Sequence, residues 1–344
     1  MAVAPSDKST IAVSPSAIPR LQGNVAAAFA MLAGMQLEVF SHLGDETRGA
    51  EALGRAIGVE TDRLSRLLYA LVAGGLLERR DDGFANTPEA AAFLVKGLPG
   101  YLGGMHELLE QLWHADLRTA QSIRSGRPSA LHDFAGASDS EMAAMLRGMH
   151  PGAVAAARDL LRHFDFSDCR SVADVGGGSG GLAATLCAAH PRLRATLFDL
   201  PRTVALAPAI LADTPGGERV DVEGGDILTA PPRRMHDAVV LRALVQVLAP
   251  DDAARAIAHA AAALRPGGRI YINGGGILDN DRLAPRAAVF LNVTFLNLYP
   301  AGASYTEAEH AAWLAAAGCG EVGRITLPNG AGIIHATRLT PSSP

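Results

Sequence analysis

The stretch "VADVGGGSGG", residues 172 to 181, decides the fold of this chain. Its residues 172–175 predict a short buried strand, and the chain from Leu182 onward has the pattern of a helix. The five glycines between them let backbone N–H groups and a helix N-terminus approach a ligand closely. Gly176, Gly178 and Gly181 match the spacing of a dinucleotide-binding loop, and Asp199 follows near the distance of a ribose-binding acid. The stretch therefore predicts a nucleotide site, although such a turn can also serve the fold alone.

Four further strands follow this stretch, separated in most cases by helical segments. They are expected at residues 195–200, 219–225, 237–241 and 269–274. Strands that alternate with helices are typical of an α/β domain with a Rossmann-like, doubly wound parallel sheet. Ligands of such sheets bind at the carboxyl ends of the strands. The candidate ligand-binding residues at or just after those ends are Asp174, Asp199, Asp226 and Arg242.

The N-terminal part of the chain has a different pattern. Residues 20–43 carry apolar side chains around much of a helical wheel, which predicts a helix buried on several sides. Residues 49–87 predict a helix, a tight turn, a second helix with Thr61 as its N-cap and Gly74–Gly75 as its end, and a short hairpin. This is a winged-helix pattern. Its second helix is apolar, which favours a dimerisation domain over a DNA-binding one.

Four parts are therefore expected along the chain. They are a disordered tail at residues 1–18, an all-helical winged-helix dimerisation domain with its hairpin wing at 19–98, a helical linker that contributes to the ligand pocket at 99–170, and the Rossmann-like domain at 171–340.

Composition excludes several classes of protein. The chain has 344 residues, 49% of them hydrophobic, and a net charge of −5, so it is globular and has no basic footprint for nucleic acid. Its three cysteines have no zinc or disulfide spacing and are expected to be core residues of a reducing compartment. No apolar run reaches the roughly 18 residues of a membrane span, and the Ser/Pro-rich start lacks the apolar segment of a signal peptide. We expect a cytoplasmic protein.

Five motifs give the nucleotide site a more specific interpretation. They are "DVGGGSG", "FDLP", "GGDIL", "DAVVLRAL" and "ALRPGGRIYI". In this order they resemble the class I S-adenosylmethionine-dependent methyltransferases, and more narrowly the family of plant caffeic-acid and bacterial natural-product O-methyltransferases. The resemblance extends over residues 20–339 and implies S-adenosylmethionine as cofactor, a homodimer and a small-molecule acceptor, with no nucleic acid, membrane or metal partner. An NAD oxidoreductase would explain the glycine loop and Asp199, but not "GGDIL" or "LRPGG".

The resemblance assigns parts of the cofactor to individual residues. Asp174 and the loop containing Gly176 and Gly178 would face the methionine part. Asp199, with Leu200 beside it, would accept hydrogen bonds from both ribose hydroxyls, as suits an ionised carboxylate. The alternative for Asp199 is a structural role, such as capping the next helix.

The other end of the cofactor would meet three further residues. Asp226 and Ile227 would border the adenine, the acid by taking its exocyclic amine and the isoleucine by packing on the ring. Arg242 stands where the family has a basic residue near the ribose and the methionine carboxylate.

The resemblance also implies a general base that this chain lacks. Typical members hold a histidine base in the phrase L-H-D-W-x-D after the fourth strand. The corresponding stretch here is "LRALVQVLAPDD", with Gln246 at the position of the base, and Gly275 and Ser304 replace the two supporting glutamates. A glutamine amide cannot accept a proton near neutral pH. The three substitutions together indicate a different acceptor.

A thioether sulfur or an activated carbon needs no base before it attacks, so proximity, orientation and a dry pocket would suffice, with Gln246 orienting the acceptor. Two subgroups of the superfamily fit, the methylthiohydroxybutyrate S-methyltransferases of dimethylsulfoniopropionate synthesis and the bacteriochlorophyllide C-methyltransferases. S-methylation comes first because a sulfonium product requires no base at any stage. An O-methyltransferase with a relocated base such as His150, and a protein that binds the cofactor without methylating, stay open.

Segments that line the acceptor site in the family supply the remaining candidates. They are Trp113, His114, Met145, Arg147, Met149, His150, Asn292, Phe295 and Tyr299. Core packing is the alternative for both methionines, whereas the two histidines and the arginine could anchor a substrate carboxylate. His236 begins the fourth strand, far from the ligand end, and is interpreted as structural. The scattered histidines have no metal-ligand spacing.

Overall fold

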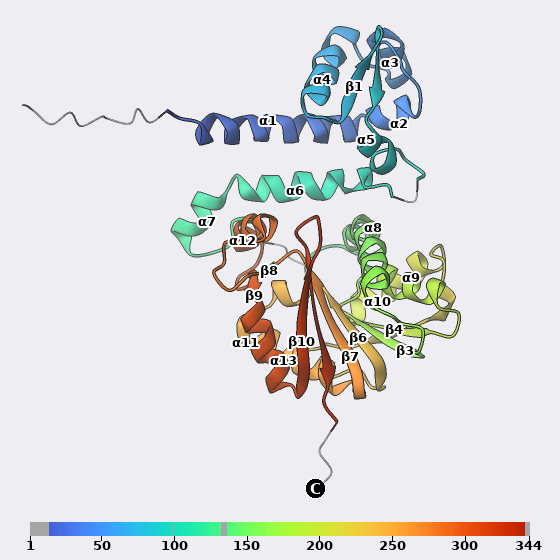
Figure 1. Cartoon of the computed structure of the whole chain (residues 1–344), viewed down its shortest axis with the longest axis vertical. Helices are drawn as coiled ribbons and strands as arrows, with labels where there is room; N and C mark the ends of the chain where they lie inside the picture. Colours follow the sequence, from blue (N-terminus) through green and yellow to red (C-terminus); the bar gives the residue numbers. More distant parts are fainter. Residues whose placement is uncertain (1–13, 99, 132–135, 341–344) are drawn as a thin grey trace, which may run out of the picture. The chain divides into compact units, whose positions relative to one another are not determined.

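The computed structural model describes residues 14–98, 100–131 and 136–340 of the chain. The chain divides into two compact units, the first ending at His106 and the second beginning at Glu107 (Figure 1). Most of the predicted tail at residues 1–18 lies outside the described residues, and residues 17 and 18 already belong to the first helix.

The first unit contains a helix–turn–helix and a hairpin. Its elements are α1 (Ala17–Gln36), α2 (Val39–Leu43), α3 (Ala50–Ile57), α4 (Thr61–Ala73), β1 (Leu77–Arg80), β2 (Gly83–Asn86), α5 (Pro88–Phe93) and the 3-10 helix η1 (Gly103–Met105). The antiparallel pair of β1 and β2 is the predicted wing, so the domain is not purely helical. The helix α4 ends before Gly74 and Gly75, as predicted.

The turn between α3 and α4 differs from the prediction in its cap. Gly58 ends α3 with a φ of +82°, a conformation that glycine adopts without strain. The N-cap of α4 is Glu60, and Thr61 is already the first helical residue. A Cβ built on Gly54 would lie 3.2 Å from the Thr61 hydroxyl, so this hydroxyl faces α3 instead of capping its own helix.

The first helix is less buried than its sequence predicts. Residues 20–43 form two helices, because the chain breaks at Glu38 with a φ of +51°. Within α1 only Leu32, Gly34 and Met35 are buried. One face of the helix leaves apolar side chains exposed at three- and four-residue spacing: Ile18, Leu21, Val25 and Phe29. The described chain therefore does not bury the apolar pattern of α1.

A seven-stranded mixed sheet forms the centre of the second unit, in the order β10-β11-β7-β6-β3-β4-β5 (Figure 1). The strands are β3 (Ser171–Val175), β4 (Arg194–Asp199), β5 (Val220–Gly224), β6 (His236–Arg242), β7 (Leu264–Gly274), β10 (Cys319–Thr326) and β11 (Gly332–Arg338). The first five are parallel, as predicted. The last two are antiparallel and extend the sheet beyond the prediction. A short parallel pair, β8 (Ile277–Leu278) and β9 (Tyr305–Thr306), stands apart.

The helices from residue 106 onward are α6 (His106–Asp116), α7 (Thr119–Ser125), α8 (Asp139–His163), α9 (Gly181–Ala189), α10 (Pro201–Leu211), η2 (Gly217–Arg219), η3 (Val245–Val247), α11 (Pro250–Ala262), α12 (Arg286–Leu298) and α13 (Glu307–Ala316). Of these, α8, α9 and α10 pack on one face of the sheet, and α11 and α13 pack on the other. Alternate strand residues face opposite layers: Val172 and Val240 pack with α8 and α9, whereas Val239 and Leu241 pack with α11 and α13. The three cysteines are free and buried, as predicted.

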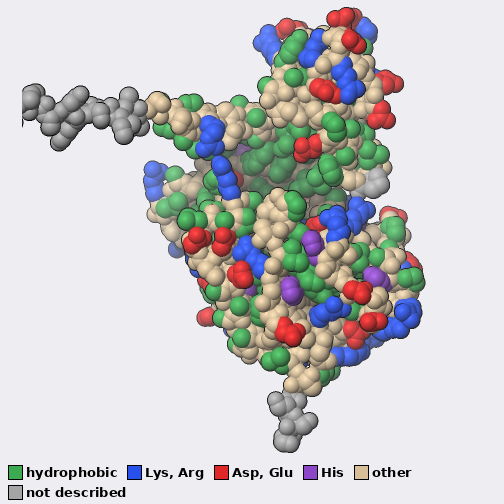
Figure 2. Space-filling model, in the orientation of Figure 1, with side chains coloured by type: hydrophobic (Ala, Val, Ile, Leu, Met, Phe, Trp, Pro, Cys, Tyr) green, Lys and Arg blue, Asp and Glu red, His purple; other side chains and the backbone are tan. Residues whose placement is uncertain are grey.

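Acidic and basic side chains are interspersed on the visible face of the second unit (Figure 2). Within the described ranges, no helix combines the length and apolar character needed to cross a membrane.

Candidate functional site

The predicted ligand-binding residues meet at the carboxyl edge of the parallel strands. Asp199 ends β4 and bridges two segments: its Oδ2 accepts the N–H of Gly178 at 2.8 Å, and its Oδ1 accepts the N–H of Leu200 at 2.7 Å. Burial raises the pKa of this carboxyl, while the N–H donors act in the opposite direction. Asp199 therefore fixes the glycine loop to the start of α10.

Glycine is required in this loop by conformation and by close contact. Gly176, Gly178 and Gly180 have φ values of +67°, +57° and +73°. A Cβ on Gly177 would lie 2.4 Å from the Cγ of Asp174, so only glycine lets the loop close over that carboxyl. Gly181, the third glycine of the predicted spacing, starts α9, where a Cβ would lie 2.9 Å from the ring of His150.

Asp174 is a fully buried carboxyl beneath this loop. Its Oδ2 accepts the N–H of Ala183 at 3.2 Å, and its Oδ1 has no partner in the described structure. Burial raises the pKa of Asp174 to about 7, against the effects of the Ala183 N–H and the positive charge of Arg242. A Cβ on Gly152 of α8 would lie 2.8 Å from Nη2 of Arg242, so this guanidinium is packed between β6 and α8.

The far end of the edge is formed by the segment after β5. Asp226 turns the chain by accepting the N–H of Leu228 on its Oδ1 at 2.9 Å. Ile227 is buried, and its carbonyl oxygen lies 2.6 Å from Nδ1 of His259. Leu200 is 48% exposed at the rim. The carboxyl ends of four parallel strands thus place acidic residues, glycines and an apolar surface along one edge of the sheet.

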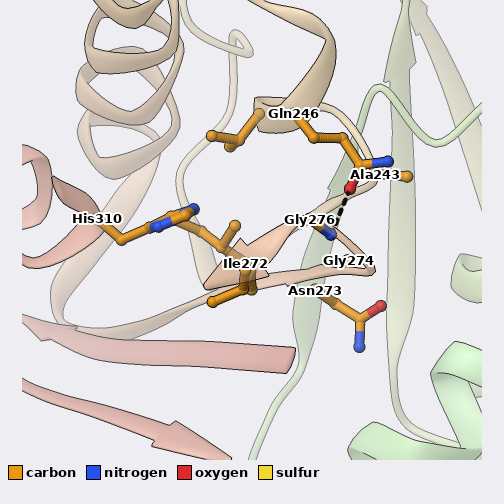
Figure 3. A pocket seen from close by; sticks show the side chains of 9 residues that line it. Ala243, Gln246, Ile272, Asn273, Gly274, Gly276 and His310 are labelled. Carbon is orange, nitrogen blue, oxygen red and sulfur yellow. Dashed lines mark hydrogen bonds between the residues drawn. The ribbon is translucent and has the colours of Figure 1, made fainter. Parts of the chain in front are cut away.

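Gln246 lies on η3, just after β6. Its Oε1 accepts the N–H of Gly276 at 3.2 Å (Figure 3). A Cβ on Gly274 would lie 2.7 Å from the same oxygen, so glycine is required beside it. The amide nitrogen points away from His310, which lies across a small cavity (Figure 3).

Gly275 and Ser304, which replace the two supporting glutamates, take part in packing contacts instead. A Cβ on Gly275 would lie 2.8 Å from Cδ2 of Leu291, so a longer side chain at this position would require the end of the Leu291 side chain to move. Ser304 is fully buried, and its hydroxyl donates to the carbonyl of Ala288 at 3.2 Å. Its backbone N–H donates to Oδ1 of Asn292 at 2.8 Å.

His150, the predicted relocated base, contacts the glycine loop. Its Nδ1 lies 3.0 Å from the hydroxyl of Ser179, a buried loop residue that the sequence analysis did not single out. Burial lowers the pKa of His150, which favours the neutral ring.

Three of the predicted acceptor-site residues come together around Gln246. Phe295 is buried on α12, and a Cβ on Gly276 would lie 3.0 Å from its ring. The ring of Tyr299 is 5.8 Å from that of Phe295, and a Cβ on Gly302 would meet both Tyr299 and the Gln246 carbonyl. Asn292 lies on the same helix and holds Ser304.

The remaining candidates lie elsewhere. Met145 and Met149 pack against the cluster of Met142, Leu146 and Ile210, so they are at least partly core residues. Arg147 is exposed and Trp113 is half-buried. His114 is exposed, with Nε2 4.0 Å from a carboxylate oxygen of Glu110. Within the described residues, no three His, Cys, Asp or Glu side chains are grouped so that they could hold a metal ion.

Comparisons with known proteins agree with this arrangement. Residues 20–96 match the O-methyltransferase dimerisation domain, and residues 118–320 match the O-methyltransferase domain. The chain is 30% identical over 320 residues to the 3-hydroxy-5-methyl-1-naphthoate 3-O-methyltransferase of Streptomyces sahachiroi, covering 90% of this chain and 91% of that protein. It is 31% identical to the tetracenomycin polyketide synthesis 8-O-methyl transferase TcmO of Streptomyces glaucescens, covering 88% and 90%.

Solved structures have the same fold. Human N-acetylserotonin methyltransferase in complex with SAM superposes with a TM-score of 0.79 at 22% identity, covering 95% of this chain and 99% of that one. The S-adenosylmethionine-dependent methyltransferase SibL superposes with a TM-score of 0.77 at 27% identity, covering 95% and 100%. The predicted fold class and cofactor are confirmed, and the oxidoreductase alternative is wrong. The chain belongs to the O-methyltransferase family and is an S-adenosylmethionine-dependent methyltransferase of small molecules with a dimerisation domain of its own.

Proposed function

We propose that this methyltransferase, which has no general base after β6, acts on an acceptor whose attacking atom carries no proton. We propose further that this atom is a thioether sulfur. The observation that carries the proposal is the carboxamide of Gln246, whose Oε1 already accepts the Gly276 N–H. Neither Gly275 nor Ser304 brings a carboxylate to it. A thioether attacks with an existing lone pair: the new S–CH3 bond forms as the S–CH3 bond of the cofactor breaks, and no proton moves.

The proposed cofactor site is the carboxyl edge of the sheet. The unpartnered Oδ1 of Asp174 suits the amino group of the methionine part, because a buried acceptor needs a donor. Each oxygen of Asp199 accepts one N–H, and the Thr203 side chain also hydrogen-bonds to this carboxyl, which leaves an acceptor position for a ribose hydroxyl. Oδ2 of Asp226 would take the adenine amine beside Ile227, and Arg242 would approach the methionine carboxylate. The bound cofactor supplies an electrophilic methyl group on a sulfonium.

The proposed acceptor pocket is bordered by Gln246, Phe295 and Tyr299, with Asn292 on the same helix as the two aromatic residues. Its aromatic lining would exclude water and hold the acceptor in line with the methyl group. The first unit would join two copies of the chain, since α1 exposes the apolar face of Ile18, Leu21, Val25 and Phe29.

A second candidate acceptor is an aromatic hydroxyl. It is favoured by the relatives, whose names describe 3-O-methylation of a hydroxynaphthoate and 8-O-methyl transfer in tetracenomycin polyketide synthesis. A hydroxyl acidic enough to ionise near neutral pH would also need no base. A less acidic one would need His150 or another relocated base.

The test is the rate of S-adenosylhomocysteine formation between about pH 6 and 9. The acceptors are methylthiohydroxybutyrate, a hydroxynaphthoate and a tetrapyrrole. The proposal expects turnover of the thioether without a rising limb in pH. Turnover of the phenol alone, rising with one ionisation that disappears in His150→Ala, would show a relocated base, and turnover of the tetrapyrrole alone would show C-methylation.

A further inference from the structure

A buried histidine, His310, lines the same small cavity as Gln246, and it is not among the residues predicted from the sequence. His310 is the fourth residue of α13 and is 1% exposed. It lines one cavity together with Gln246, and its ring points into that cavity (Figure 3). The signal in the sequence is a polar residue on the apolar side of a helix, six positions after Ser304.

The hydrogen bond of one ring nitrogen determines the role of the other. Nδ1 of His310 lies 2.8 Å from the carbonyl oxygen of Thr306. A carbonyl only accepts, so Nδ1 carries the hydrogen, and in the neutral ring Nε2 is an acceptor. Burial lowers the pKa of His310, which favours this neutral form.

The cavity between the two side chains has a volume of about 10 Å³, which is about the space of one water molecule. The lining residues with polar groups are His310, Gln246, Asn273, Gly274 and Gly276. The side chain of Asn273 points away from His310 (Figure 3). The other lining side chains are those of Ala243, Val245, Ile272 and Ile277.

We propose that His310 is a positioning residue for Gln246, acting through one water molecule in this cavity. The water donates one hydrogen to Nε2 of His310 and the other to Oε1 of Gln246. Oε1 then has both lone pairs occupied, one by this water and one by the Gly276 N–H. The Gln246 amide can therefore present only its N–H groups to the acceptor. This rests on the proposed function and narrows it: the acceptor carries a carbonyl, carboxylate or ether oxygen near its methyl-accepting atom.

Protonation would change one hydrogen bond of this arrangement. When Nε2 of His310 carries a hydrogen, it donates to the water, which accepts with a lone pair and can still donate to Oε1 of Gln246. The charged and titratable groups near the ring are Glu309 on α13, Arg324 on β10 and Tyr305 on β9. Glu309 favours the charged ring and Arg324 disfavours it. The cavity lining adds no further charge among the described residues. Because the water can donate to Oε1 in either protonation state of His310, turnover with a thioether acceptor is expected to show no acid limb.

Two variants of His310 test the contacts of its two ring nitrogens separately. His310→Asn keeps a donor for the Thr306 carbonyl but does not reach the cavity, whereas His310→Gln can place an amide oxygen near the position of Nε2. With saturating cofactor, His310→Asn should lower kcat/KM about three- to tenfold, mainly through the KM of the acceptor, as expected for one hydrogen bond. His310→Gln should restore most of this loss. Cofactor affinity, measured by calorimetry, should be unchanged in both.

The double variant distinguishes a role of His310 in positioning Gln246 from a general contribution of His310 to the stability of the fold. In a Gln246→Ala background, His310→Asn should have no further effect on kcat/KM. An equal loss in both backgrounds, or no loss in either, would overturn the proposal. If no acceptor is turned over, the proposed function fails, but nitrogen NMR of the histidine-labelled protein still tests the His310 assignment. It should show the Nδ1–H tautomer, with an Nε2 shift that moves in Gln246→Ala. An Nε2–H tautomer, or a shift that Gln246→Ala leaves in place, would refute it.

Discussion

Replacing Asp174 by asparagine should stabilise the cofactor-free protein and weaken its cofactor binding. The pKa of Asp174 is raised to about 7, first of all because its carboxylate is buried; the Ala183 N–H and the charge of Arg242 offset this only in part. A carboxyl whose pKa is higher in the folded state binds its proton more tightly there. The free energy of unfolding therefore falls as the pH rises from about 4 to about 7.

The magnitude follows from the size of that shift. Ionising Asp174 lowers the free energy of unfolding by up to about 4 kcal/mol, at about 1.4 kcal/mol for each pH unit between the two pKa values. Asparagine has the same shape, can still accept the Ala183 N–H and does not ionise. The variant should gain most of that amount at pH 8, since the pKa of about 7 already includes the attraction between Asp174 and Arg242. At pH 5 the gain should be smaller by roughly 2.5 kcal/mol.

Denaturant unfolding of both proteins without cofactor, at pH 5 and pH 8, measures this difference. Buried histidines with lowered pKa, such as His236 and His310, act in both proteins and cancel in the comparison. Asp237→Asn is the matched control. Burial also opposes ionisation of Asp237, but N–H donors and Arg265 outweigh it and lower its pKa, so this variant should be destabilised at pH 8. An Asp174→Asn variant no more stable than the parent at pH 8, or equally stabilised at both pH values, would refute the reasoning.

Three further outcomes are expected. Asp199→Ala should weaken S-adenosylmethionine binding by roughly 1.5–3 kcal/mol in calorimetry, because the ribose hydroxyls lose a charged acceptor; unchanged affinity, or tight NAD binding by the parent, would contradict this. The full chain should be a homodimer in light scattering, and a chain starting near residue 100 should be poorly soluble or monomeric; a monomeric full chain at micromolar concentration would argue against the exposed face of α1 as an interface. Gln246→His should not raise the rate with the native acceptor and should lower it through lost orientation; a faster variant would show that a base is useful there.

The parallel part of the sheet could be predicted because each strand is an apolar run that ends in a ligand-type residue. Asp174 and Asp199 were found in this way, since strand ends and glycine loops are local features of sequence. The strands β10 and β11 were missed, although "PNG" at residues 328–330 is a hairpin signal, because glycines interrupt β10 and weaken its pattern. The apolar pattern of α1 is visible in the sequence. The sequence does not show whether this apolar face is buried within one chain or between two copies of the chain.

Residues defined by tertiary contacts could not be found from the sequence. His150 was selected for its residue type and segment, and only the fold reveals its contact with Ser179. His310 lies far from Gln246 in sequence, and only the fold brings both side chains to one cavity. Burial decides the protonation state of such histidines, and burial is not a local property.

Packing also explains why the missing general base cannot be restored by one substitution. A histidine at position 246 would lack a carboxylate partner, because the neighbouring positions are committed to other contacts. Glutamate at position 275 would displace Leu291, whose Cδ2 lies 2.8 Å from the Cβ site. Glutamate at position 304 would bury an unpaired charge where Ser304 is fully buried, and would remove the hydroxyl bond to Ala288. The same contacts that replaced the base stabilise α12, which carries Phe295 and Tyr299. A base-dependent acceptor would therefore require changes at positions 246, 275 and 304 and in the residues of α12 that contact positions 275 and 304.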